Sequence, residues 1–351
     1  MAAAPASDPH GSAIRLDPRS ADPARIHLYR PQNQLGDLLL SVPAIRSIRE
    51  RFPRARVTLV VGRQNAAAVL GQPWVDEVRV VDTRNFLGFL RVGIPAALGG
   101  ALGGASPNLA VYFTTVSYSR SSAMLVRSSL ARERVGFDPA WYGERDRALL
   151  TRRVAYPAPR AAPTVHQSEV SLELARAVGA GERPDPPYYV ADPALADRAP
   201  KGAIYLHPGA GKLHNRWPAE RFGALAREFL ALGREVQWLE GPQDRGCVDR
   251  AAATLGRSLP VVSGETVPAL AARFSHAGLY VGNDTGPLHL AGAVGCPTVG
   301  VYGWTDPAEW RPVGRCVRSV RAADHTLESI QPRDVLDVAL PLLKEERCSV
   351  V

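Results

Sequence analysis

Short apolar runs along the chain alternate with segments in which apolar residues recur every three or four positions. The apolar runs predict strands at 26–30, 56–61, 75–81, 109–113, 202–207, 235–239, 279–281 and 297–302. The periodic segments predict helices at 36–52, 64–70, 166–178, 219–232, 248–255, 267–274, 288–294 and 332–344. Strands and helices that alternate in this way form parallel sheets with right-handed crossovers. We therefore expect an α/β protein with doubly wound parallel sheets.

Proline-rich stretches and the chain length suggest how the domains are divided. At 351 residues the chain is long enough for two domains of ordinary size. The stretch 184–201 is rich in proline and predicts a linker, which leaves one domain at 23–183 and a second at 202–330. A closing helix and tail occupy 331–351. The first residues, 1–22, lack an apolar core segment, so we expect a disordered tail and not a signal peptide.

One apolar segment, 86–105, has about the length needed to cross a membrane. Arg91, Pro95 and several glycines interrupt it and make a spanning helix a poor interpretation. A packed helix with its loop is the expectation, and contact with a membrane surface is the alternative.

The composition limits the classes of partner and the cell compartment that fit this chain. The net charge of +8 is spread through both halves, without the Lys/Arg block or the interleaved aromatic residues of a nucleic-acid groove. No nucleic-acid partner is expected, and a phosphorylated or membrane-bound anionic substrate fits the charge better. The four cysteines are scattered with no Cys-x-x-Cys, so neither a zinc site nor a disulfide framework is indicated. A reducing cytoplasm fits this pattern.

The densest group of polar residues lies between a predicted strand and a predicted helix, near residue 284. Asp284, Thr285 and Gly286 stand at the helix start, and His289 lies one turn further along on the same side as Thr285. Capping of the helix would explain a lone Asp or Thr at this place. A carboxylate, a hydroxyl, an imidazole and glycines in one loop favour instead an anionic ligand at the helix N-terminus.

Two further loops at predicted strand ends carry candidate ligand residues. The loop after 202–207 combines glycines with basic side chains like a phosphate cradle, without being a Walker motif. Its candidates are Gly209, Gly211, Lys212 and Arg216, and the loop after 235–239 adds Gln243. No two aspartates stand two residues apart, so an Asp-x-Asp metal clamp is absent from the sequence. Cationic side chains and helix termini are then expected to neutralise a diphosphate.

The N-terminal half offers one carboxylate at a comparable place. Asp37 lies in the first turn of the helix that follows the first strand. It either complements the helix dipole or acts as a catalytic group at the carboxyl end of the sheet, and the residues alone leave both readings open. Arginines along 117–134, including Arg120 and Arg127, form either a solvated helix face or a site for an acidic acceptor.

Three segments resemble glycosyltransferase family 9, the ADP-heptose:lipopolysaccharide heptosyltransferase family. They are Leu35-Gly-Asp-Leu-Leu-Leu-Ser-Val-Pro-Ala44, then His207-Pro-Gly-Ala-Gly with Arg216-Trp-Pro-Ala-Glu-Arg-Phe222, and Gly282-Asn-Asp-Thr-Gly-Pro-Leu-His-Leu-Ala291 with Gly303-Trp-Thr-Asp-Pro307. They occur in family order from near residue 26 to near residue 315. The resemblance implies a GT-B architecture of two Rossmann-like domains that face each other across a cleft. The first domain would bind the acceptor, and the second the nucleotide sugar.

The resemblance also implies the reaction and its setting. It implies inverting, metal-independent transfer of a heptose or related sugar from an ADP-sugar, with no cofactor. The acceptor would be an anionic glycolipid or saccharide of the lipopolysaccharide core. The enzyme would work in the cytoplasm, with peripheral contact at the inner face of the membrane.

Residue roles follow from the same resemblance. Asp37 matches the proposed general base, Asp284 would hold sugar hydroxyls, and the N–H groups of Thr285 and Gly286 would hold the diphosphate. His289 would support that loop. The remaining donor-site expectations are Gly209, Gly211, Lys212, Arg216 and Gln243. For the acceptor, the expected residues are Arg30, Gln34, Arg120 and Arg127.

This sequence departs from the family pattern at two places. Asn215 stands where the family usually has a lysine, so Lys212 or Arg216 would have to supply the cation. The loop at 30–35 is one residue longer than usual, which leaves open what Arg30 contacts. Three alternatives remain: a GT-B nucleotide-sugar epimerase, a family 9 transferase with another donor sugar and a soluble acceptor, and a nucleotide-binding protein without turnover.

Overall fold

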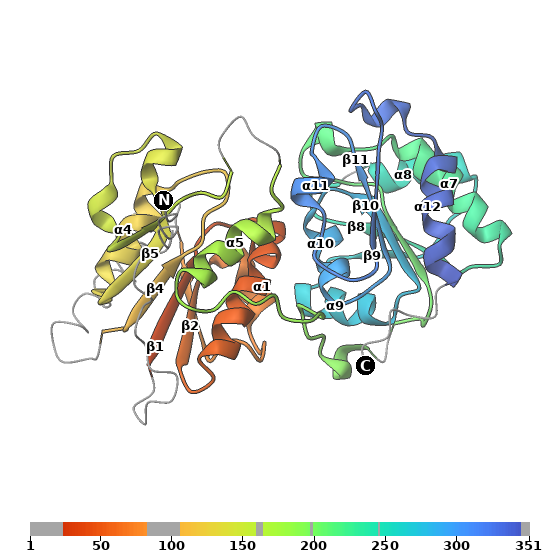
Figure 1. Ribbon diagram of the computed structural model, residues 1–351. Coiled ribbons are helices and arrows are strands. Elements are labelled where there is room, and N and C mark those ends of the chain that lie inside the picture. Colours follow the sequence, from red (N-terminus) through yellow and green to blue (C-terminus); the bar gives the residue numbers. More distant parts are fainter. Residues whose placement is uncertain (1–23, 83–105, 159–163, 197–198, 245, 345–351) are drawn as a thin grey trace, which may run out of the picture. The chain divides into compact units, whose positions relative to one another are not determined.

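The computed structural model describes residues 24–82, 106–158, 164–196, 199–244 and 246–344 (Figure 1). The predicted tail at 1–22 and the apolar segment at 86–105 lie outside these ranges. Two compact units divide the chain, one built on each of two sheets. The first takes most of the chain up to Pro184 and the second begins in the main at Asp185, but residues 34–40 and 164–167 group with the second unit.

The first unit contains a six-stranded parallel sheet in the order β3-β2-β1-β4-β5-β6. Its strands are β1 (Arg25–Arg30), β2 (Arg56–Gly62), β3 (Glu77–Val81), β4 (Leu109–Tyr112), β5 (Glu133–Phe137) and β6 (Arg152–Val154). The helices are α1 (Leu35–Arg51), α2 (Ala66–Val69), α4 (Arg120–Ser128) and α5 (Gln167–Arg176), with short 3-10 turns at Arg63–Asn65, Pro139–Tyr142 and Arg147–Leu149. The central strand β1 is flanked by β2 and β4 in parallel register, with Tyr29 opposite Val60 on one side and Tyr112 on the other.

The second unit repeats this plan, in the order β12-β11-β10-β7-β8-β9. Its strands are β7 (Ile204–His207), β8 (Val236–Glu240), β9 (Val261–Ser263), β10 (Leu279–Asn283), β11 (Thr298–Tyr302) and β12 (Val317–Arg321). Its helices are α6 (Pro193–Ala196), α7 (Ala219–Ala231), α8 (Cys247–Leu255), α9 (Val267–His276), α10 (Gly286–Ala293), α11 (Pro307–Trp310) and α12 (Pro332–Lys344), with 3-10 turns at Leu213–Asn215 and Leu327–Ser329. Helices α7, α8 and α12 lie on one face of the sheet, and α9 and α10 lie on the other (Figure 1).

Both sheets share one strand order, in which the third, second and first strands of the unit are followed by the fourth, fifth and sixth. This is the Rossmann order, and it confirms the predicted fold class of two doubly wound parallel sheets. The winding direction reverses between β1 and β4 in the first unit and between β7 and β10 in the second. At such a switch point the loops that leave two neighbouring strands diverge, and a crevice opens at the carboxyl edge.

Four strands are absent from the sequence-based assignment: β5, β6, β9 and β12. The arginine-bearing segment 117–134 is helical only as far as Ser128, and Leu130 then adopts the left-handed conformation, with φ of 54°. That conformation ends a helix, so the chain turns and enters β5. Arg134 lies within β5, opposite Ala110 of β4, and its guanidinium donates to the carbonyl oxygens of Leu149 and Ala131.

A large apolar core supports the second sheet. Helix α7 places residues on one face at helical spacing, and among them Phe222 and Phe229 are fully buried with Trp217 and Trp238. The indole of Trp217 donates to the carbonyl oxygen of Ile330 at 3.0 Å, which satisfies its buried N–H group. The core therefore fixes the start of α7 and the end of the loop that precedes it.

Candidate active site

A groove lies at the switch point of the second sheet, where β7 ends at His207 and β10 ends at Asn283. Within the second unit, three loops line this groove, at 210–215, 241–244 and 284–289, and Trp310 contributes a ring. The structure thus brings the three predicted donor loops to one place. The sequence order of these loops did not require this, because β10 follows β7 only after two intervening strands.

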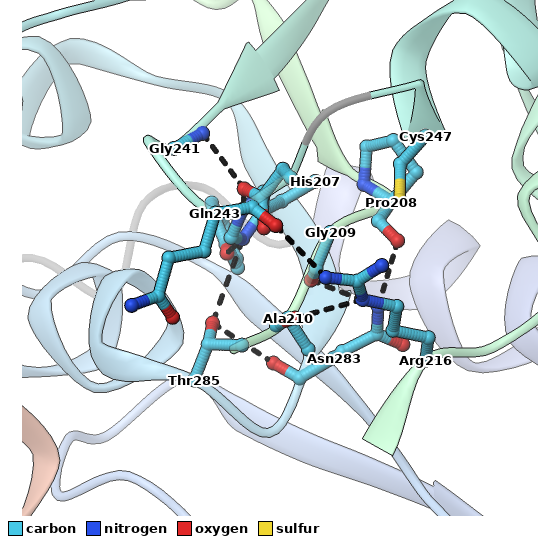
Figure 2. A network of polar contacts seen from close by, with 12 residues as sticks. His207, Pro208, Gly209, Ala210, Arg216, Gly241, Gln243, Cys247, Asn283 and Thr285 are labelled. Carbon is cyan, nitrogen blue, oxygen red and sulfur yellow. Dashed lines mark hydrogen bonds and ion pairs between the residues drawn. The ribbon is translucent and has the colours of Figure 1, made fainter. Parts of the chain in front are cut away.

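Helix α10 begins in the groove, and the side chain of its N-cap residue makes no capping hydrogen bond. Thr285 occupies the N-cap position in extended conformation, with φ of −150° and ψ of 167°, and makes no side-chain cap. Its hydroxyl donates instead to the carbonyl oxygen of Asn283, at 3.2 Å (Figure 2). Capping by Asp or Thr, the ordinary explanation of such a sequence, is therefore not what Thr285 does. The positive end of the α10 dipole and the backbone N–H groups of its first turn therefore lie at the groove, which is the arrangement of anion sites.

His289 and Asp284 contact each other across the first turn of α10. The Nε2 atom of His289 lies 3.5 Å from Oδ1 of Asp284, and the imidazole is only 4% exposed. Within the residues that the structure describes, Nδ1 of His289 has no hydrogen-bond partner. His289 thus contacts the first residue of the loop, and its role in supporting that loop stays a prediction.

Asn283 connects the loops from beneath and was not predicted as a site residue. Its Oδ1 accepts from the Trp217 N–H at 3.0 Å, and its amide nitrogen donates to the carbonyl oxygens of Pro208 and Gly209 at 3.1 and 3.0 Å (Figure 2). The side chain is fully buried, so these bonds replace all of its contact with water. Asn283 therefore fixes the path of the loop after β7 relative to β10.

Arg216, predicted as a donor-binding residue, holds two loops together. Its Nε donates to the Ala210 carbonyl at 2.8 Å and its Nη2 to the Gln243 carbonyl at 2.9 Å (Figure 2). Lys212, by contrast, is exposed and lines the groove beside Asn215. Of the two candidate replacements for the lysine that Asn215 displaces, Lys212 is the one whose side chain lines the groove.

A buried acid–imidazole pair forms the floor of the groove. Nε2 of His207 lies 2.7 Å from Oδ2 of Asp244, and the two residues are 2% and 3% exposed. The Asp244 carboxylate also accepts from the Gly241 N–H at 2.7 Å. Burial alone would raise the pKa of Asp244, but the hydrogen bond and charge of His207, the Gly241 N–H and the charge of Arg216 together hold it below its ordinary value.

This floor explains one of the two predicted glycines, Gly209. A side-chain carbon at Gly209 would stand 1.9 Å from Cγ of Asp244, and one at Gly211 would stand 2.8 Å from Oε1 of Gln243. Only glycine lets the backbone of this loop pass so close to the carboxylate.

Beside the groove is an apolar pocket that sequence reasoning missed. Leu239, Val262, Val267 and Leu270 line it, and Glu240 and Ser263 add polar groups. The pocket depends on β9, which is three residues long and was not recognised. The available signal was the Val-Val pair at 261–262 bounded by Pro260 and Gly264, a short apolar run between turn residues.

The predicted catalytic and acceptor residues lie on β1, on the loop and helix that follow it, and on α4. Asp37 lies in the first turn of α1, partly buried, after the carboxyl end of β1. Arg30, the last residue of β1, is 2% exposed and donates from Nη1 to the Phe113 carbonyl and to Gln32. This guanidinium joins the ends of β1 and β4.

The remaining acceptor candidates are more exposed. Gln34 is exposed in the loop that precedes α1. Arg120 begins α4 and pairs with Asp146 at 3.0 Å, with its side chain 67% exposed. Arg127 lies near the other end of α4, about 10 Å along the axis from Arg120. Arg120 and Arg127 therefore do not meet at one point.

No group of three or more His, Cys, Asp or Glu residues in the described ranges is placed to hold a metal ion. None of their helices is both long enough and apolar enough to cross a bilayer.

Known proteins resemble this chain in sequence and in structure. Residues 115–337 match the model of glycosyltransferase family 9 (heptosyltransferase). Lipopolysaccharide heptosyltransferase 3 of Escherichia coli is 26% identical over 306 residues, which cover 79% of this chain and 83% of the relative.

Two solved structures share the fold. The family 9 glycosyl transferase of Veillonella parvula matches with a TM-score of 0.79 at 20% identity, covering 93% of this chain and 98% of that one. Heptosyltransferase WaaC of E. coli with ADP matches with a TM-score of 0.73 at 20% identity, covering 91% and 99%. The resemblance noted in the sequence is confirmed by the family match. This chain is a glycosyltransferase that belongs to family 9, the heptosyltransferase family.

Proposed function

We propose that this glycosyltransferase moves a heptose, or a closely related sugar, from an ADP-linked donor to a hydroxyl of a lipopolysaccharide-core saccharide. Transfer proceeds with inversion and without a metal ion. The proposal rests on family membership for the reaction class, and on the groove of the second unit for the donor. A relative named lipopolysaccharide heptosyltransferase 3 and a related structure that contains ADP support the choice of acceptor and nucleotide.

The observation that carries the proposal is the uncapped N-terminus of α10 at the switch point. A diphosphate placed there meets the backbone N–H groups of Thr285 and Gly286 at the positive end of the helix dipole. These groups stabilise charge that grows on the leaving diphosphate as the glycosidic bond breaks. The hydrogen bonds of Asn283 hold the loop that carries these N–H groups, so the groups need no rearrangement when the charge develops.

Lys212 supplies positive charge next to the diphosphate. Its side chain lines the groove, whereas Arg216 is engaged with two carbonyl oxygens and Asn215 carries no charge. An ammonium group and helix amides can together replace the divalent cation that other nucleotide-sugar enzymes use.

The rest of the donor occupies the neighbouring surfaces of the second unit. The apolar pocket formed by Leu239, Val262, Val267 and Leu270 suits a nucleobase, and Glu240 suits ribose hydroxyls. Asp284, held by His289, accepts hydrogen bonds from the hydroxyls of the transferred sugar. Gln243 contributes its amide from the loop after β8.

Asp37 acts as the general base of the transfer. The acceptor oxygen attacks the anomeric carbon as its proton passes to the Asp37 carboxylate, and the bond from that carbon to the diphosphate oxygen breaks with the electron pair leaving on ADP. A single displacement of this kind inverts the anomeric configuration. Arg30 and Arg120 supply positive charge toward an anionic acceptor, and the enzyme meets that acceptor at the cytoplasmic face of the membrane.

The test is a donor and acceptor panel with the full-length chain. ADP-, GDP- and UDP-sugars are incubated with and without a lipid A-bearing core acceptor, with a lipid-free core saccharide as a third arm, and nucleoside diphosphate release is measured. We expect release from ADP-heptose that depends on acceptor. Release without acceptor, or a change of the sugar alone, would favour epimerisation or hydrolysis and contradict transfer.

The Asp37→Asn variant tests the general-base role of Asp37 in the same assay. Transfer should fall by at least 100-fold while ADP affinity, measured calorimetrically, stays within about threefold. Glu50→Gln is the matched control, because Glu50 lies on the same helix and its exposed carboxylate pairs with Arg46. Transfer by Asp37→Asn within tenfold of the unchanged chain would show that another group takes the proton.

A further inference from the structure

Trp304 is the most exposed large apolar residue in the part of the chain that the structure describes. It is 81% exposed, whereas the other five tryptophans are buried or partly buried. An indole that stays in water gives up the hydrophobic stabilisation that burial of so large a ring provides. The packing of the fold therefore gives no reason for a tryptophan at this position.

The loop that carries Trp304 is held on both sides by one arginine. Arg321, the last residue of β12, donates from Nε to the Gly303 carbonyl at 3.2 Å and pairs through Nη1 with Oδ2 of Asp306 at 3.0 Å. The other carboxylate oxygen of Asp306 accepts from the Ala308 N–H at 2.8 Å, which caps α11. These contacts fix the backbone before and after the indole. A ligand that binds Trp304 therefore has little loop entropy to overcome.

The order of strands places Trp304 at the sugar end of the proposed donor site. The pocket proposed for the nucleobase lies at β8 and β9, and the proposed diphosphate site lies at the start of α10, after β10. The sheet order is β12-β11-β10-β7-β8-β9, so the loop after β11 lies on the other side of β10 from that pocket (Figure 1). Two strand spacings, about 10 Å, separate β8 from β10, and β11 comes next. A donor that extends from nucleobase to diphosphate therefore directs its sugar toward the loop after β11.

Trp304 lies at the rim of the groove and not inside it. Trp310, at the end of α11, lines the groove, whereas Trp304 is not among the lining residues. The transferred sugar occupies the groove, and the acceptor hydroxyl must reach the anomeric carbon of that sugar. An acceptor ring consequently lies directly beyond the transferred sugar, at the rim. The C–H groups on one face of a pyranose carry partial positive charge, which suits the negative face of an indole.

The charges beside Trp304 favour a neutral ring. Residues 303–310 include two acidic residues and no lysine or arginine. Segments that dock on anionic bilayers carry basic residues next to their apolar ones, which this segment lacks. Negative charge here also disfavours a phosphorylated or carboxylated ring. A hydroxyl-rich, uncharged pyranose is the ligand that fits both the indole and its neighbours.

We propose that Trp304 binds the acceptor by stacking its indole on a neutral pyranose ring next to the hydroxyl that receives the sugar. Arg321 is a positioning residue, because it touches no substrate and holds the loop that carries the indole. The inference rests on the proposed function, which supplies the direction of the donor and the saccharide nature of the acceptor.

The kinetic test uses the full-length chain, ADP-heptose and a lipid-free core saccharide at varied concentration. Trp304→Ala should raise the KM for the saccharide about tenfold, with kcat within about threefold and calorimetric ADP affinity within about twofold of wild type. Trp304→Tyr should recover most of the loss because it restores a flat ring, whereas Trp304→Leu should resemble Trp304→Ala. Leu232→Ala truncates another exposed apolar residue of the second unit and should leave KM unchanged.

The stacking contact can also be observed without turnover. In protein labelled with 5-fluorotryptophan, the 19F signal of Trp304, identified by its absence in Trp304→Phe, should shift on addition of the core saccharide. Arg321→Gln should raise the KM for the saccharide about threefold in the wild-type chain and by less than about 1.5-fold in Trp304→Ala, because the arginine acts through the indole. A merely structural defect would cost the same in both backgrounds.

Several outcomes would overturn the inference. A saccharide KM for Trp304→Ala within twofold of wild type would do so, as would full recovery by Trp304→Leu, which would show that apolar area and not a flat ring matters. Weaker binding of Trp304→Ala to phosphatidylethanolamine–phosphatidylglycerol vesicles, with unchanged KM for the lipid-free saccharide, would assign the indole to the bilayer instead. A wild-type chain that transfers nothing from ADP-heptose contradicts the proposed function, whereas normal transfer with unchanged KM contradicts this inference alone.

Discussion

The backbone of Gly209 packs directly against the carboxylate of Asp244, so that a side-chain carbon at 209 would lie 1.9 Å from Cγ of Asp244. The contact joins the loop after β7 to the turn after β8 with no space between them. Since Asp244 also accepts from His207 and Gly241, it cannot move aside without losing two buried hydrogen bonds. The glycine is thus required by its neighbour and not by its own backbone conformation.

Gly209→Ala should therefore be much more damaging than Gly211→Ala. The added methyl at 209 meets a fixed carboxylate, and we expect a loss of about 2 kcal/mol or more in the free energy of unfolding. At 211 the nearest atom is the end of the Gln243 side chain, at 2.8 Å, which can rotate away. Urea unfolding of the two variants provides the comparison, and equal losses would show that Asp244 can be displaced easily.

Asn283→Asp should destabilise the second unit strongly. The substitution removes the two N–H donors that satisfy the Pro208 and Gly209 carbonyls and places a buried carboxylate against them. A cost of about 3–5 kcal/mol follows from an uncompensated buried charge. Asn108→Asp is the control, because Asn108 is exposed and its Oδ1 accepts from the Arg25 N–H, a role that aspartate keeps. A loss similar to that of Asn108→Asp would contradict the assigned amide orientation.

Asp244 should add stability that disappears in acid. Its pKa in the folded chain lies below the ordinary value, near 3.9 in the unfolded chain, so its contribution is complete above that value and is lost as pH falls toward the folded pKa. The difference in unfolding free energy between wild type and Asp244→Asn should be constant above about pH 5 and shrink below about pH 4. Urea unfolding from pH 7 to pH 3 measures it. A difference that widened on acidification would mean that the pKa is raised.

Lys212→Gln should weaken nucleoside diphosphate binding by about tenfold and make the remaining affinity less sensitive to salt. The reason is the loss of a cation whose attraction to the diphosphate is screened by ions. Calorimetric titration with ADP at low and high salt tests both effects. Lys201→Gln alters another exposed lysine of the second unit and should leave binding unchanged. Should Arg216→Gln abolish affinity while Lys212→Gln leaves it intact, the cation assignment would be wrong.

Sequence reasoning recovered the strands that are buried on both faces and missed those that are short or carry arginine. Strands β1, β2, β7 and β10 are buried at almost every position and are rich in apolar residues, because helices cover both sides of a parallel sheet. Strands β5 and β12 contain arginines and partly exposed positions. Their pattern resembles a polar helix, so only pairing with a neighbouring strand identifies them.

Residue roles were harder to predict than residue positions. The positions of Gly209, Gly211, Asp284 and Thr285 in loops at the ends of strands could be predicted, because glycines and helix-start residues are local signals. Their roles in donor binding stay predictions. Arg216 has the expected charge, but its guanidinium binds carbonyl oxygens within the protein. Asn283 and Asp244 gave no local signal, since their importance lies in partners up to 75 residues away.

The sequence by itself determined that this chain forms alternating strands and helices in two parallel sheets, and it marked the glycine-bearing loops and the helix start where an anion can bind. These properties depend on neighbours within a few positions along the chain, so the order of residues suffices. The tertiary structure alone decided which loops meet at one switch point, which cation remains in the groove, and which buried acid contacts His207. Those outcomes depend on pairs brought together by strand order, and desolvation gives such pairs their strength.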